Sequence, residues 1–263
     1  MKKTAFAILV FTGLFAFNNF ASPVLSDNFN SYPDGNLTNG TTWFQTAAAA
    51  NPVQVNSGVV TLNNSGQDVY SPFSSPVTLA DGQSLYFGLA INVSAAQATG
   101  DYFMHFTPNA GNSSLFYDRL FVESTTGGYV LGLEGTAGGG AVVTYGTTVL
   151  SLNTSYNIVL AYNYFAATPS NSVDAVYINP TSSTVGNNTP YLTAAWSSAN
   201  ADTNQIAAIN FRQGSSSLAP TLTVDNLVVS TLFSDIVPAP EPSTMALAAL
   251  GAAAGFFAWR RRR

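Results

Sequence analysis

Short stretches in which apolar and polar side chains alternate run through most of the chain. The clearest is Leu85–Val93, where every second residue is Leu, Phe, Leu, Ile or Val. Strict alternation of this kind predicts a β-strand with one buried face. Tyr156–Tyr164 has the same pattern, and Val173–Ile178 is placed to pair with it across the polar segment Thr168–Asn171. These segments predict strands rather than helices.

The last alternating stretch, Leu222–Val229, has two candidate faces. Simple alternation places Leu222, Val224, Asn226 and Val228 on one face and Leu227 and Val229 on the other.

Tyr102–Phe106 is also strand-like, which predicts that His105 is a sheet residue rather than a catalytic base.

Clusters of Gly, Pro, Asn and Ser separate about a dozen such segments, and no helical period of useful length is found outside the termini. Many short strands without crossover helices predict an all-β fold, an antiparallel β-sandwich. We assign this exported domain to residues 22–233.

Both termini carry membrane-targeting features. Lys2 and Lys3 precede the apolar run Ala5–Phe17, which is typical of a signal peptide for Sec-type export, and we expect residues 1–21 to be removed after Ala21. At the other end, Ser243–Trp259 is uncharged and apolar, and its length is at the lower limit for a transmembrane helix. The basic tail that follows, Arg260, Arg261, Arg262 and Arg263, predicts a cytoplasmic end at residues 260–263.

The C-terminal region resembles the PEP-CTERM sorting domain of exported bacterial proteins. The features that carry the resemblance are the motif Pro240-Glu241-Pro242 in a Pro-rich linker (residues 234–242), the helix at 243–259 and the four arginines. The resemblance implies recognition by an exosortase, cleavage near Pro-Glu-Pro, and delivery of an inner-membrane precursor to the cell surface or extracellular matrix. Two prolines hold the motif extended, in a form that a protease can bind.

The charge of the exported region excludes several partners. Outside the targeting segments only Arg119 and Arg212 are basic, against twelve acidic residues, so the formal net charge is about −10. Such a surface repels nucleic acid and anionic lipid. We therefore expect neutral or cationic partners and no nucleic acid.

The residue inventory also limits the chemistry. The chain has no cysteine, one histidine, and no lysine after Lys3. Thiol nucleophiles, disulfides, thiolate zinc sites and Schiff bases are therefore excluded, and a His-rich metal site cannot form within one chain.

A second resemblance concerns the exported region. The segments Asp27–Leu37, Val176–Pro180 and Val224–Val229 look like parts of concanavalin A-like, laminin-G-like jelly rolls. That group includes lectins, glycan-binding modules and glycanases, so the resemblance implies the architecture and suggests an association with carbohydrate.

A glycanase would need a pair of carboxylates, and Glu123 and Glu134 are the only glutamates between the targeting segments. The Glu-x-Asp-x-x-Glu string that is common in jelly-roll glucanases is missing, and isolated surface carboxylates explain both residues. We therefore predict a protein that is not an enzyme, with a secreted glycanase as the alternative.

Sugar binding by a non-catalytic protein fits the abundant aromatic residues better, because aromatic rings stack on sugars. The candidates beside polar segments are Trp43, Tyr117, Tyr164, Tyr191 and Trp196. For any one of them, packing in the core or against a loop is the more common role. A structural matrix protein without a small ligand is the competing class.

One cofactor is considered, a structural calcium ion. Asp27 and Asp225 fall in the first and last predicted strands, which are often neighbours in jelly rolls. Together with Asn226 they could supply some of the six to eight oxygen ligands that calcium requires. Acidic residues that merely end strands are the alternative.

Overall fold

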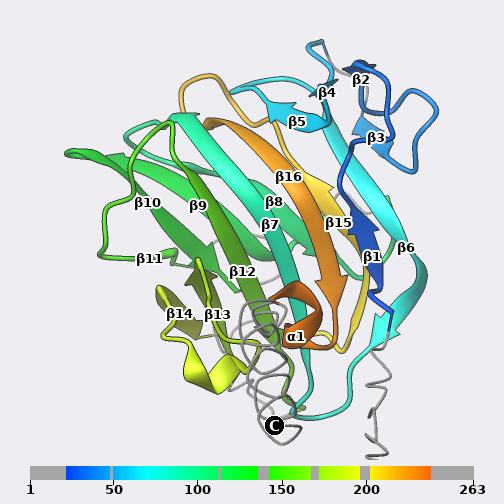
Figure 1. Ribbon diagram of the computed structural model, residues 1–263, viewed down its shortest axis with the longest axis vertical. Helices are drawn as coiled ribbons and strands as arrows, with labels where there is room; N and C mark the ends of the chain where they lie inside the picture. The colour runs from blue at the N-terminus through cyan, green and yellow to red at the C-terminus, as the bar shows by residue number, and fades with distance from the viewer. Residues whose placement is uncertain are drawn as a thin grey trace, which may run out of the picture.

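The structure of the protein is a computed structural model. It describes residues 22–47, 50–111, 114–135, 142–166, 172–195 and 202–237. These residues form two antiparallel sheets that pack face to face as a β-sandwich (Figure 1). The fold class predicted from the alternation is confirmed. The predicted signal peptide, the Pro-Glu-Pro motif, the predicted transmembrane segment and the arginine tail lie outside the described residues.

The first sheet has nine strands. They are β1 (Leu25–Asp27), β2 (Gly35–Asn36), β4 (Gln54–Asn56), β5 (Val59–Leu62), β7 (Ser84–Ala95), β12 (Ser155–Asn163), β13 (Val173–Ile178), β14 (Leu192–Ala195) and β16 (Thr221–Ser230). Their order is β14-β13-β12-β7-β16-β5-β4-β2, and β1 pairs with β16 at the side. The predicted pairing of Val173–Ile178 with the preceding strand is confirmed by the β12–β13 ladder.

The second sheet has seven strands. They are β3 (Phe44–Ala47), β6 (Asp68–Thr78), β8 (Asp101–Thr107), β9 (Tyr117–Thr125), β10 (Gly128–Glu134), β11 (Thr144–Tyr145) and β15 (Gln205–Phe211), in the order β11-β10-β9-β8-β15-β6-β3. The short 3₁₀ helix η1 (Val185–Asn187) lies between β13 and β14.

The core lies between the two sheets. Every apolar residue that alternation assigned to the inner face of β7 is buried, from Leu85 to Val93. Phe87 of β7 stacks on Phe106 of β8, with ring centroids 3.5 Å apart, and so links the two sheets. Trp43 stacks on Phe211 with centroids 4.8 Å apart. Burial of large aromatic rings is the main stabilising contribution in such a core.

The face prediction for β16 is wrong beyond its midpoint. Asn226 has a φ of +52°, and the pairing with β7 shifts between Asp225 and Val228, which marks a β-bulge. The extra residue moves Leu227 onto the core face with Val224, whereas Asn226 and Val228 face outward. A strand read as strictly alternating cannot reveal such an insertion.

A single turn of helix, α1 (Phe233–Ile236), lies against the outer face of the nine-stranded sheet beside β7 and β16 (Figure 1). Phe233 packs edge-on against Tyr86 and Tyr177, and Ile236 occupies the space above Gly88. The packed domain thus extends to Val237, which includes four residues that the sequence assigned to the linker. Among the described residues, no helix is long and apolar enough to span a bilayer.

Candidate functional site

The outer face of the seven-stranded sheet carries a row of polar and aromatic side chains. Phe44 is paired with Tyr70, Tyr70 with Asn210, and Asn210 with His105, across strands β3, β6, β15 and β8. Their strand neighbours Val69, Phe211 and Met104 belong to the core. Because side chains alternate along a strand and paired residues share a face, these four residues point away from the core.

The row continues across β9 and β10 through Arg119 and Glu134, which are directly paired. We call the set Phe44, Tyr70, Asn210, His105, Arg119 and Glu134 the outer row. Each residue is contributed by a different strand, so the antiparallel register of the sheet determines their spacing.

Two arginines meet over one tyrosine beside the outer row. The guanidinium carbon atoms of Arg119 and Arg212 lie 5.2 Å and 4.3 Å from the centroid of the Tyr102 ring. Arg119 forms an ion pair with Glu134, and Arg212 Nη1 forms one with Asp101 Oδ2 at 2.6 Å. Both basic side chains of the exported region are therefore neutralised locally, and this face offers no unpaired cation for an anionic sugar.

His105 is held neutral in this environment. It is 4% exposed and packs between the rings of Tyr102 and Phe116. Burial, helped by the positive charges of Arg212 and Arg119, lowers the pKa of His105 from 6.5 to about 3. Its location in β8 confirms the prediction of a sheet residue, and a side chain that stays unprotonated down to this pH cannot act as a general acid near neutrality.

The accessible part of the face is an aromatic shelf formed by Phe44 and Tyr70. Phe44 is 48% exposed, and its ring lies 5.6 Å from that of Tyr70 at an angle of 32°. Gly111 lies against the Tyr70 hydroxyl and so bounds the shelf on one side. Tyr70 is half-buried, so Phe44 offers most of the ring surface that could stack on the apolar face of a sugar.

The two glutamates considered for glycoside hydrolysis do not form a pair. Glu123 lies opposite Val130, whereas Glu134 lies opposite Arg119, four residues away along β9. At about 3.3 Å per residue this separates them by roughly 13 Å along the strand. Retaining enzymes need about 5 Å and inverting enzymes about 6.5–9.5 Å. The backbone positions of the two glutamates are thus farther apart than either spacing, and the Glu134 carboxylate is held by Arg119.

Most of the aromatic residues proposed from sequence are part of the core. Trp43 and Tyr117 are buried, Tyr164 packs partly buried against the core, and the Tyr191 hydroxyl donates to the Thr148 carbonyl. Trp196 lies outside the described residues. Sequence reasoning selected Trp43 but missed the next residue, Phe44, which alternation places on the opposite face. The large ring of a tryptophan suits stacking on a sugar, but the same size favours burial in the core.

The predicted calcium ligands are neighbours in the sheet but do not converge. Asp27 of β1 lies opposite Leu227 of β16 and faces the core, where its carboxylate accepts hydrogen bonds from Trp43 Nε1, the Tyr32 hydroxyl and Phe29 N. Asp225 lies opposite Ala90 on the outer face, and Asn226 lies in the bulge. The pairing of first and last strands is as expected, but Asp27 and Asp225 occupy opposite faces. This donor set does not fit one ion.

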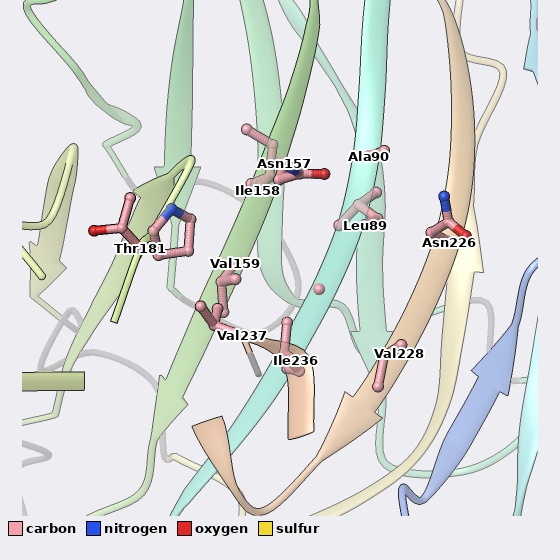
Figure 2. Close-up of a pocket in the computed structure, with 12 residues that line it drawn as sticks. Leu89, Ala90, Asn157, Ile158, Val159, Thr181, Asn226, Val228, Ile236 and Val237 are labelled. Carbon is pink, nitrogen blue, oxygen red and sulfur yellow. The ribbon is translucent and has the colours of Figure 1, made fainter. Parts of the chain in front are cut away.

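A separate hollow of about 380 Å³ lies on the other sheet, beside α1 (Figure 2). Asn157, Ala90 and Asn226 line it from three neighbouring strands, and Ile236 and Val237 close one end. Its described lining contains no aromatic ring and no charged side chain. It therefore lacks the groups that bind sugars most strongly.

Comparison with protein families assigns the C-terminal part of the chain. Residues 238–263 match the PEP-CTERM protein-sorting motif. The C-terminus is a PEP-CTERM sorting motif. The protein is thus an exported β-sandwich that is sorted by an exosortase. The comparison with curated protein sequences gives no match.

Several solved structures have a similar fold. The alginate lyase Aly36B, as a mutant in complex with alginate tetrasaccharide, has a TM-score of 0.50 and 17% sequence identity, and the match covers 80% of this chain and 98% of that one. The evolved Dit CBM2 module of Lactobacillus casei BL23 phage J-1 has a TM-score of 0.49, 11% identity and coverage of 79% and 94%. Lectin II from Ulex europaeus has a TM-score of 0.45 and 12% sequence identity, and the match covers 80% of this chain and 99% of that one. At these identities the likeness shows the fold alone, which is the β-sandwich predicted from the sequence.

Proposed function

We propose that the exported domain is a non-catalytic, glycan-associated protein of the cell surface or extracellular matrix, and that it binds polysaccharide through the outer face of the seven-stranded sheet. The observation that carries the proposal is the aromatic shelf formed by the exposed Phe44 and the partly exposed Tyr70. The amide and charged groups of the outer row beside it are buried and hold the shelf from below. The two rings supply stacking area for the apolar face of a sugar.

The local charge favours a neutral polysaccharide. Arg119 and Arg212 are already paired with Glu134 and Asp101. Asp68, which lies close to Arg212, adds a further carboxyl group, and burial raises its pKa. An anionic sugar would have to displace one of these ion pairs or enter the field of an acidic domain. A neutral chain does neither.

Paired variants test the binding face. Phe44→Ala and Tyr70→Ala should each weaken binding to a neutral polysaccharide by about 5- to 100-fold. The reason is that stacking of a ligand ring on one aromatic side chain contributes roughly 1–3 kcal/mol. Phe165→Ala removes a ring that is 39% exposed elsewhere in the chain and serves as the matched control. Affinity electrophoresis against neutral and uronate-containing polysaccharides measures both effects.

If Phe44→Ala and Tyr70→Ala bind the polysaccharide as tightly as the control Phe165→Ala, the glycan binds elsewhere on the protein. A preference for the uronate-containing chain would contradict the argument from paired arginines. The length of the polysaccharide after incubation distinguishes binding from the alternative of a secreted carbohydrate-active enzyme, because only an enzyme shortens the polysaccharide.

A further inference from the structure

The chain leaves the described domain at the edge of the hollow beside α1. Ile236 and Val237, the last two described residues, line this hollow (Figure 2). Residues 238–242 follow directly, read Pro-Ala-Pro-Glu-Pro, and form the start of the matched sorting motif. The sorting motif therefore begins within covalent reach of a concave surface on its own domain.

The packing of α1 fixes this exit point on the outer face of the nine-stranded sheet. Phe233 packs edge-on against two tyrosine rings, and Ile236 occupies the space above Gly88. The Ser230 hydroxyl donates to Asp235 Oδ2 at 2.5 Å. Because the segment after α1 starts from a held position, only a short loop has to close for it to reach the hollow, and the entropy cost is small.

The lining of the hollow suits an extended, proline-rich segment. Val159 and Pro180 supply apolar surface, and the exposed Asn157 and Asn226 supply amide groups from two strands (Figure 2). These amides can donate to the carbonyl oxygens of the segment, which a polyproline II backbone leaves without internal partners. Three of the five residues 238–242 are proline, so holding them in one conformation costs less entropy than for other residues.

The length of the segment matches the hollow. At about 3.1 Å per residue, Glu241 lies at most roughly 12 Å from Val237 along an extended segment. Asn226 and Val237 line the same hollow of about 380 Å³, so Asn226 is within this reach. The exposed Ser94 lies six residues beyond Gly88 in the same strand, β7. This corresponds to roughly 20 Å, which is too far.

We infer that residues 238–242 dock in this hollow, and that the docking restrains processing by the exosortase. The enzyme and the hollow compete for the same five residues, so only the undocked fraction of the precursor is a substrate. The inference rests on the sorting motif and is independent of the proposed glycan binding. The domain thereby limits the rate of its own release.

Cysteine cross-linking of the full-length chain in detergent tests the docking. The chain has no cysteine of its own, so Asn226→Cys combined with Glu241→Cys gives a single defined pair. In a thiol–disulfide buffer this pair should form an intramolecular disulfide at least about 10-fold faster than Ser94→Cys combined with Glu241→Cys, because docking raises the effective concentration of the thiols. Adding Ala90→Trp fills the hollow and should slow the first pair by about 5-fold or more. Asn157→Trp takes its place if that variant does not fold.

Equal rates for the two pairs, or no slowing by the tryptophan, would overturn the docking. A disulfide between two chains would also overturn it, because the hollow would then accept a second copy of the protein. This measurement needs no exosortase, so its outcome does not depend on sorting.

The rate of release tests the restraint. In a host with an exosortase, Ala90→Trp alone should be released at least about 3-fold faster than the wild type, because more of the precursor is undocked. Ser94→Trp is the matched control and should be released at the wild-type rate. Pulse-chase labelling with cell fractionation measures the three rates. Release of Ala90→Trp at the wild-type rate would show that docking does not restrain the enzyme.

Discussion

At the scale of single residues, His105 makes stability depend on pH. Burial holds its pKa near 3, against 6.5 in the unfolded chain, so the unfolded state binds more protons between these values. Stability conferred by the neutral ring is therefore complete above about pH 6.5 and is lost as the pH falls toward 3, by about 4–5 kcal/mol in total. The raised pKa of Asp118 acts with the opposite sign, since stability from its protonated form is lost as the pH rises.

We expect His105→Gln to reduce the acid-side loss. Between pH 7 and pH 4 the free energy of unfolding should fall in both proteins, but by roughly 3–4 kcal/mol less in the variant. The reason is that the variant has no imidazole to be protonated in the unfolded state below pH 6.5. Urea denaturation at the two pH values measures the difference. Parallel losses in both proteins would show that His105 is protonated in the folded state.

At the scale of elements, the bulge in β16 determines which residues of the last strand reach the core. Asn226 adopts the left-handed conformation, with φ +52°, which asparagine and glycine tolerate better than other residues. Asn226→Val should therefore destabilise the domain by about 1–2 kcal/mol, whereas Asn226→Gly should change stability little. Asn92→Val on the outer face of regular strand β7 is the matched control. Chemical denaturation measures the free energy of unfolding of the three variants. An Asn226→Val protein as stable as the wild type would contradict the role of Asn226 in the bulge.

The same element shows how far sequence reasoning extends. Regular alternation sufficed for β7, since a pleated strand buries every second residue and five apolar residues in register leave one choice of face. The bulge at Asp225–Asn226 could not be predicted, because an inserted residue is fixed by pairing with β7 and leaves no local hydrophobic signal. The burial of Asp118 of β9 close to Asp174 of β13 and to Asp202 could not be predicted for a related reason. It depends on how two sheets pack, and these residues are far apart in the chain.

At the scale of the whole molecule, sorting and binding occupy different parts of the chain. The sorting motif matches residues 238–263, and the described part of the packed domain reaches Val237 on the outer face of the nine-stranded sheet. The proposed glycan-binding face belongs to the other sheet. We therefore expect the released form to keep the proposed binding surface.

Release from the membrane should depend on Pro240 and Glu241. In a host with an exosortase, replacing both with alanine should leave membrane insertion unchanged, because Ser243–Trp259 and the arginine tail are retained, but should block release. Thr244→Ala, just beyond the motif, is the control. Cell fractionation and mass spectrometry follow the products. Release of the double variant at the wild-type rate and cut point would leave a plain C-terminal anchor as the remaining explanation.

Co-sedimentation of the released protein with the neutral polysaccharide of its own matrix, followed by sizing of the polysaccharide, tests the central claim most directly. The protein should sediment with the polymer and lose this ability in Phe44→Ala, while the polymer keeps its length throughout. A protein that stays in the supernatant would contradict the binding claim, and a polymer that becomes shorter would contradict the claim that the domain is not an enzyme.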